Sequence, residues 1–150
     1  MRYLPPAVKN LLIINIIVFI GTELIGDPMY QWFALFPIGS PFFRWWQFVT
    51  HMFMHGNFMH IFFNMWSLIV FGPMLERLWG SKKFLIFYFV CGLGAALCHE
   101  LVLLTQPLSN IPTVGASGAI YGLLLGFGML FGLILILIWK KKGQMYTEWE

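Results

Sequence analysis

Charged residues are scarce in this sequence. Only 10% of its 150 residues are charged and 59% are hydrophobic, whereas soluble domains carry roughly 25% charged residues. So few charges cannot cover a water-exposed surface, which excludes a soluble globular protein and indicates an integral membrane protein. The nine basic and six acidic residues form no basic cluster interleaved with exposed aromatics, so we expect no nucleic-acid partner.

Cysteine and histidine are also few. Cys91 and Cys98 are seven residues apart in one apolar run. On a helix they would be separated by about 10 Å along the axis, too far for a disulfide between them. They are therefore interpreted as reduced packing residues. The four histidines follow no zinc-type spacing with cysteine, so the sequence predicts no metal and no cofactor.

Long apolar runs dominate the sequence instead. A bilayer needs about 20 apolar residues for a helical span, and we predict spans at about residues 8–25, 58–75, 84–104 and 116–139. A signal peptide is the alternative for the first run, but no Ala-x-Ala-like cleavage site follows it, so a retained span is preferred. The predicted fold class is an all-α polytopic membrane protein, with one domain over residues 1–150.

The segment 26–57 lies between the first two predicted spans and has a different composition. Pro28, Pro37 and Pro41 interrupt it, so it cannot form one spanning helix. It is nevertheless rich in Trp and Phe, more than a plain external loop would be. Aromatic side chains concentrate at membrane–water boundaries, so we predict a membrane-interface loop here.

Basic residues fall almost entirely on one side of the predicted spans. Eight of the nine lie in the N-terminal leader, in the segment 76–83 or in the C-terminal tail, and Arg44 alone lies on the other side. Because Lys and Arg concentrate in cytoplasmic segments, both termini are predicted to be cytoplasmic and the aromatic loop external. The expected location is a bacterial inner membrane.

Three polar residues then share one depth near the external face. His60 and Asn64 are four residues apart at the start of the second span, so they lie on one helix face. Ser117 begins the fourth span between Gly115 and Gly118. Polar residues at such depths usually face the bundle interior or a water cavity. Two interpretations are open: a serine-based site, or interhelical hydrogen bonds with small-residue packing.

These residues carry a resemblance to the rhomboid intramembrane serine proteases. His55, His60 and Asn64 match that family's pattern of His, four residues, His, three residues, Asn. Residues 115–118, Gly-Ala-Ser-Gly, match its Gly-x-Ser-Gly nucleophile motif, and Tyr121 follows as it often does in the family. The combination is far more specific than either motif alone.

The resemblance covers about residues 11–122 and implies a shortened rhomboid-like bundle, since the family has a six-helix core. It implies a serine endopeptidase acting on transmembrane protein substrates within the lipid bilayer. Ser117 would be the nucleophile, while its own N–H, His60 and Asn64 would stabilise the oxyanion, each donor being worth about 3 kcal/mol. His51 and His55 would orient the outer loop. A departure is Gln47, where the family frequently has Arg.

The general base that the family carries on its sixth helix is not found, because no His follows Ser117 in these 150 residues. Gly128, Gly132 and the apolar run after them resemble the family's sixth helix, with Leu125 at the position of the base. One hypothesis joins the head of helix four directly to the tail of helix six. The other is coincidence, since glycines at this spacing are common in membrane helices. Of the remaining histidines, His60 and His99 are nearest to Ser117 in depth.

Three functions remain open from the sequence. The residue match favours a rhomboid-like serine endopeptidase. The missing base favours a catalytically inactive relative that binds transmembrane helices without cutting them. The third is a small four-span membrane scaffold. Gly118, Gly122 and Gly126 form a stripe suited to close helix contact, for which packing within the chain is preferred over an oligomer.

Overall fold

The computed structural model describes residues 3–105 and 110–147 of the chain, apart from the side chains after Lys140. The elements, in order, are α1 (Pro6–Ile25), α2 (Asp27–Phe33), α3 (Gln47–Thr50), the short 3₁₀-helix η1 (His51–Phe53), α4 (Phe58–Trp79), α5 (Ser81–Leu103) and α6 (Ser117–Thr147). Some sequence-based expectations lie outside the described residues: the contribution of Arg2 to the charge asymmetry, residues 106–109 of the loop before Ser117, and the tail after residue 147.

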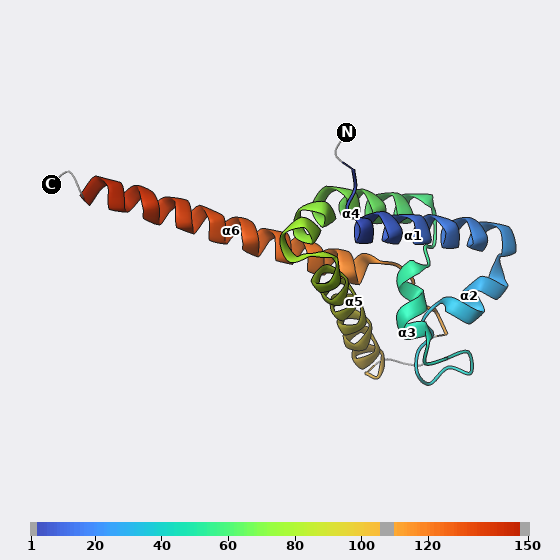
Figure 1. Cartoon of the computed structure of the whole chain (residues 1–150). Coiled ribbons are helices and arrows are strands. Elements are labelled where there is room, and N and C mark those ends of the chain that lie inside the picture. Colours follow the sequence, from blue (N-terminus) through green and yellow to red (C-terminus); the bar gives the residue numbers. More distant parts are fainter. Residues whose placement is uncertain (1–2, 106–109, 148–150) are drawn as a thin grey trace.

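Four helices, α1, α4, α5 and α6, are long and apolar enough to cross a membrane by length and composition. This confirms the predicted all-helical, four-span fold class. α1 and α4 pack side by side, and α5 crosses them at a steep angle (Figure 1). α6 begins among these helices and then projects away from them toward its C-terminal end (Figure 1).

The connection between α4 and α5 is shorter than predicted. α4 continues to Trp79 and α5 begins at Ser81, so the predicted gap over residues 76–83, between the spans 58–75 and 84–104, is wrong. The single linking residue is Gly80, whose φ of 81° is unfavourable for residues with a side chain. A charged residue at the end of an apolar run is expected in a loop, but the side chain of Glu76 is buried.

Glu76 caps the N-terminus of α1 across the bundle. Its carboxylate accepts hydrogen bonds from the backbone N–H groups of Ala7 and Val8, both at 2.8 Å, and from the Ser81 hydroxyl at 2.6 Å. The cap residue Pro5 makes no side-chain capping bond, so the unsatisfied N–H groups of the first turn need another acceptor. A carboxylate also complements the positive end of the helix dipole.

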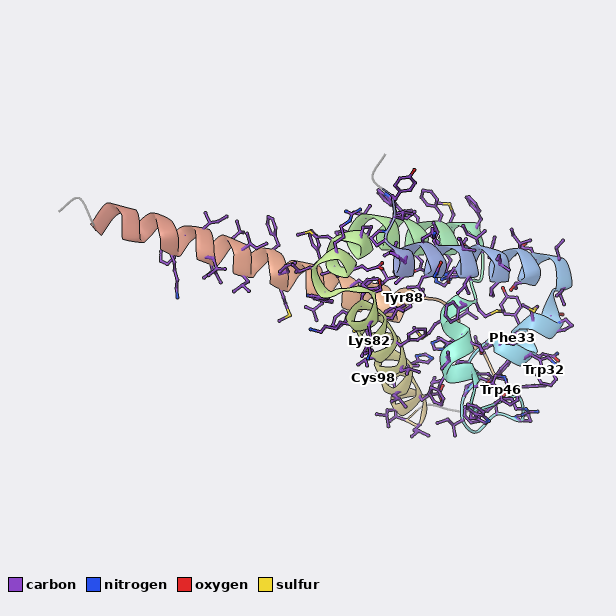
Figure 2. All side chains as sticks on the ribbon, viewed as in Figure 1. Trp32, Phe33, Trp46, Lys82, Tyr88 and Cys98 are labelled. Atoms are coloured by element: carbon purple, nitrogen blue, oxygen red, sulfur yellow. The ribbon has the colours of Figure 1, made fainter. Side chains whose placement is uncertain are left out.

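The segment 26–57 is built from short helices and hydrogen-bonded turns. Trp32 and Trp46 stack at its edge, with ring centroids 6.0 Å apart, at the end of the molecule opposite the projecting part of α6 (Figure 2). The buried Gln47 amide organises this segment. Its oxygen accepts from the N–H groups of Phe36 and Arg44, and its nitrogen donates to two further backbone carbonyls.

The first half of α6 packs against α5 through residues with little or no side chain. A Cβ at Gly118 would lie 2.6 Å from the Cβ of Ala95, and one at Gly122 would overlap Cys91. The predicted glycine stripe therefore packs within the chain. Cys91 and Cys98 are both free, but Cys98 is exposed and is not a packing residue.

We predict that Glu76→Ala destabilises the bundle by roughly 3 kcal/mol, because two backbone N–H groups and a hydroxyl lose their acceptor. The free energy of unfolding in detergent micelles measures this. Ser81→Ala is the matched control, since it removes one of the three hydrogen bonds and leaves the carboxylate in place. Equal stability of Glu76→Ala and the wild type would contradict the assigned role of this cap.

Candidate functional site

A cavity of about 250 Å³ lies at the N-terminal end of α6. It is large enough for several water molecules. Its walls include small residues of α5 and α6, and its polar lining comes from η1, α5, the loop before α6 and α6 itself: His51, His99, Thr113, Ser117 and Tyr121. Segments distant in sequence therefore meet around the predicted nucleophile.

Ser117 is the first residue of α6. The first N–H groups of a helix have no intrahelical acceptor and favour negative charge, so the Ser117 N–H is available beside its own hydroxyl. The preceding turn is fixed by a hydrogen bond of 2.9 Å from the Gly115 N–H to the carbonyl of His51. The hydroxyl is thus held at a helix N-terminus, next to the cavity.

His60 lies in the first turn of α4, which is capped by Asn57. The Asn57 side chain accepts the His60 N–H at 2.8 Å. The Nδ1 atom of His60 is placed to accept the Gly56 N–H at 3.5 Å, an arrangement that assigns the ring proton to Nε2. His60 therefore presents an N–H donor on its far edge.

Gly115 brings Ser117 and His60 together. A Cβ built at Gly115 would lie 2.7 Å from Nε2 of His60 and 3.7 Å from Oγ of Ser117, and the φ of Gly115 is 124°. Both the space and the backbone conformation require glycine here. Nε2 of His60 and Oγ of Ser117 therefore both lie close to the position that a Gly115 side chain would occupy.

His60, Asn64 and His55 all lie outside the lining of the cavity. The Asn64 amide donates to the carbonyl of His60 at 3.1 Å, one turn earlier on α4. The His55 ring packs edge-to-face on that of His60, with centroids 5.1 Å apart. His55 is fully buried, and neither ring nitrogen has a hydrogen-bond partner among the described residues. Burial, with a smaller contribution from the neighbouring His60, lowers the pKa of His55 to about 4, so it is neutral at pH 7.

His51, which we expect from the sequence to orient the outer loop, also lines the Ser117 cavity. Its Nδ1 is 2.8 Å from the carbonyl of Gln47. Only an N–H can satisfy a carbonyl oxygen, so Nδ1 carries the proton and Nε2 keeps a lone pair. Burial lowers the pKa of His51 below the ordinary value of 6.5, which favours this neutral form.

Sequence reasoning missed the residues that fix the loop before Ser117. Thr113 forms an antiparallel bridge with Leu35, with N–O distances of 2.7 and 3.0 Å. Its hydroxyl is 2.7 Å from Nε2 of His99. The buried carboxylate of Glu100 accepts the N–H of Ile38 at 3.0 Å and so ties α5 to the segment 26–57, which also contains Leu35. No local pattern marks Thr113 or gives Glu100 this role, whereas the sequence does indicate His99 by its depth near Ser117.

Metal ligation finds no support in the described part of the chain, where no three His, Cys, Asp or Glu side chains are grouped closely enough to hold an ion. The chemistry that the arrangement offers is that of a hydroxyl nucleophile with nearby N–H donors and neutral imidazoles.

Comparison with known proteins gives one consistent result. The family model described as the Rhomboid domain matches residues 43–147. YdcA of Bacillus subtilis (strain 168) is 35% identical over 106 residues, covering 68% of this chain and 49% of that protein. Rhomboid protease GlpG of Yersinia enterocolitica is 30% identical over 129 residues, covering 85% and 44%. Rhomboid protease GluP of Bacillus subtilis is 34% identical over 104 residues, covering 69% and 18%. The chain spans less than half the length of these relatives.

The buried, neutral His55 predicts a pH-dependent stability. Its pKa is about 4 in the folded state against an ordinary 6.5. Between these values the unfolded state binds a proton that the folded state does not, so stability falls as the pH is lowered through this window, by about 3 kcal/mol in total. His55→Phe should lose this part of the dependence. Unfolding free energies of both proteins at pH 7.5 and pH 4.5 measure it, and an equal loss in both would contradict the prediction.

Proposed function

The chain belongs to the rhomboid family, and from that premise we propose that it carries the nucleophile and the oxyanion-stabilising groups of a serine endopeptidase acting on transmembrane protein segments. The observation that supports this most directly is that Nε2 of His60 and Oγ of Ser117 lie 2.7 Å and 3.7 Å from the position that a Gly115 Cβ would occupy.

The proposed reaction begins with attack of Ser117 Oγ on the carbonyl carbon of a substrate peptide bond. The carbonyl oxygen becomes an oxyanion, and the Ser117 N–H and the His60 Nε2–H are its proposed donors. Such donors act through charge that develops only in the transition state, and each is typically worth about 3 kcal/mol. Asn64 uses one amide N–H on the carbonyl of His60, and its second N–H is proposed to serve the oxyanion.

We assign the role of proton acceptor to His51. It lines the cavity that holds Ser117, its tautomer leaves a lone pair on Nε2, and its lowered pKa keeps it neutral at pH 7. A general base can act through one water molecule, for which the cavity has room. His99 lines the same cavity, but its Nε2 is already engaged with the Thr113 hydroxyl.

A second candidate function is binding of transmembrane helices without cleavage. The observation in its favour is that no His follows Ser117 within the 150 residues. The hypothesis that helix four is joined directly to a helix-six tail stays a prediction. α6 continues without a break through Leu125 and Gly132, which is compatible with such a junction and does not test it. In both candidates the protein is an integral membrane protein, with both termini proposed to lie in the cytoplasm.

We predict that the reconstituted chain cleaves a model transmembrane substrate and that Ser117→Ala abolishes this cleavage. A serine-directed fluorophosphonate should label the wild type and leave Ser117→Ala unlabelled, which tests the nucleophile independently of the choice of substrate. Thr113→Ser, a conservative change in the lining of the same cavity, is the control. Substrate binding without cleavage or labelling in every variant would reject the peptidase and establish the helix-binding function.

We further predict that His51→Gln lowers kcat by about 100-fold or more, the contribution of a positioned general base. The base must be neutral, and the pKa of His51 is lowered, so wild-type activity should rise with pH and reach half its maximum below pH 6.5. This rise should vanish in His51→Gln and persist in the matched variant His99→Gln. A pH–rate profile unchanged by His51→Gln would assign the proton acceptor to another group.

A further inference from the structure

A second feature lies at the opposite end of the bundle from Ser117. Between the last turns of α4 and the middle of α6 there is a groove of about 410 Å³. Arg77 on its α4 wall is 17 residues beyond His60, which is about 25 Å along the helix axis. The groove and the serine site are therefore separate. Its walls combine four apolar side chains with a single cation: Met74, Leu78, Leu130, Ile134 and Arg77.

The guanidinium of Arg77 is largely unused by the protein. One N–H group donates to the carbonyl of Tyr3 at 3.2 Å, which leaves four of the five guanidinium donors. Across residues 3–105 and 110–140, no carboxylate forms an ion pair with Arg77. The adjacent Glu76 carboxylate is turned inward onto α1. The side chain is exposed and can reorient toward a ligand.

We propose that this groove binds one anionic phospholipid, with an acyl chain along the apolar walls and the phosphate on Arg77. The guanidinium has the planar donor pattern that pairs with phosphate oxygens. Basic pockets between membrane helices on the cytoplasmic side are suited to anionic headgroups, and the charge distribution predicts that this end of the bundle is cytoplasmic.

Neighbouring charge supports an anionic lipid over a zwitterionic one. Lys82 and Lys83 are exposed in the first turn of α5, just beyond Gly80 (Figure 2 labels Lys82). Basic residues near the headgroup layer attract anionic lipids. An apolar helix packed into the groove would instead cover Arg77 without a counter-charge, which is unfavourable. A free phosphate ion would leave the apolar walls unused.

Native mass spectrometry of the detergent-solubilised chain tests the proposal. Phosphatidylglycerol and phosphatidylcholine with identical acyl chains are added in turn, and the bound fraction is measured for each. We expect the wild type to bind phosphatidylglycerol in preference to phosphatidylcholine. In Arg77→Gln the ratio of bound phosphatidylglycerol to bound phosphatidylcholine should fall about fivefold. Arg44→Gln removes the same charge in the loop at the other end of the molecule and should keep the preference.

The apolar walls are tested by filling the groove. Leu130→Trp should reduce retention of both lipids, whereas Ile138→Trp, on the exposed part of α6, should not. Glycerol-1-phosphate, a headgroup without acyl chains, should fail to displace the bound lipid at millimolar concentration. The proposal is overturned if Arg77→Gln and Arg44→Gln behave alike, if Leu130→Trp retains lipid normally, or if glycerol-1-phosphate competes as well as the lipid does.

Discussion

The close approach of α6 to its neighbours is the constraint on which the site depends. Gly118 lies against Ala95 and Gly122 against Cys91, so the two helix backbones meet where any larger side chain would hold them apart. Without a hydrophobic driving force between helices in lipid, such small-residue contacts provide much of the packing energy. The same approach brings Gly115 onto the ring of His60. The packing of α6 against its neighbours therefore also determines where the candidate site residues lie.

Hydrogen bonds at the ends of the helices then hold those ends against their neighbours. Glu76 ties the start of α1 to the junction of α4 and α5. Thr113 ties the loop before α6 to α5, and Glu100 ties the segment 26–57 to α5. In a bilayer, backbone groups near the helix ends must find partners within the protein or at the boundary. Two of these bonds link distant parts of the chain, Ala7 with Glu76 and Ile38 with Glu100, which are 69 and 62 residues apart.

Much of this arrangement could be predicted from the sequence, and the reason is physical. Apolar run length indicates spans, and depth within those spans put Ser117 and His60 at one level. The C-terminal end of α4 could not be predicted, because Glu76 has the charge of a loop residue and the burial of a core residue. Nor could the position of His51, since the fold of the loop 26–57 depends on long-range hydrogen bonds rather than on local periodicity.

Gln47 shows how one departure from the family pattern acts on the site. Its side-chain oxygen accepts two backbone N–H groups, those of Phe36 and Arg44. Arginine, which the family frequently has at this position, has no acceptor atom, so these N–H groups would need other partners. The backbone carbonyl of Gln47 in turn fixes the tautomer of His51. The side-chain amide of Gln47 therefore anchors the loop, and the backbone carbonyl of the same residue orients His51, the proposed proton acceptor. The conformation of this loop and the role proposed for His51 thus depend on one residue.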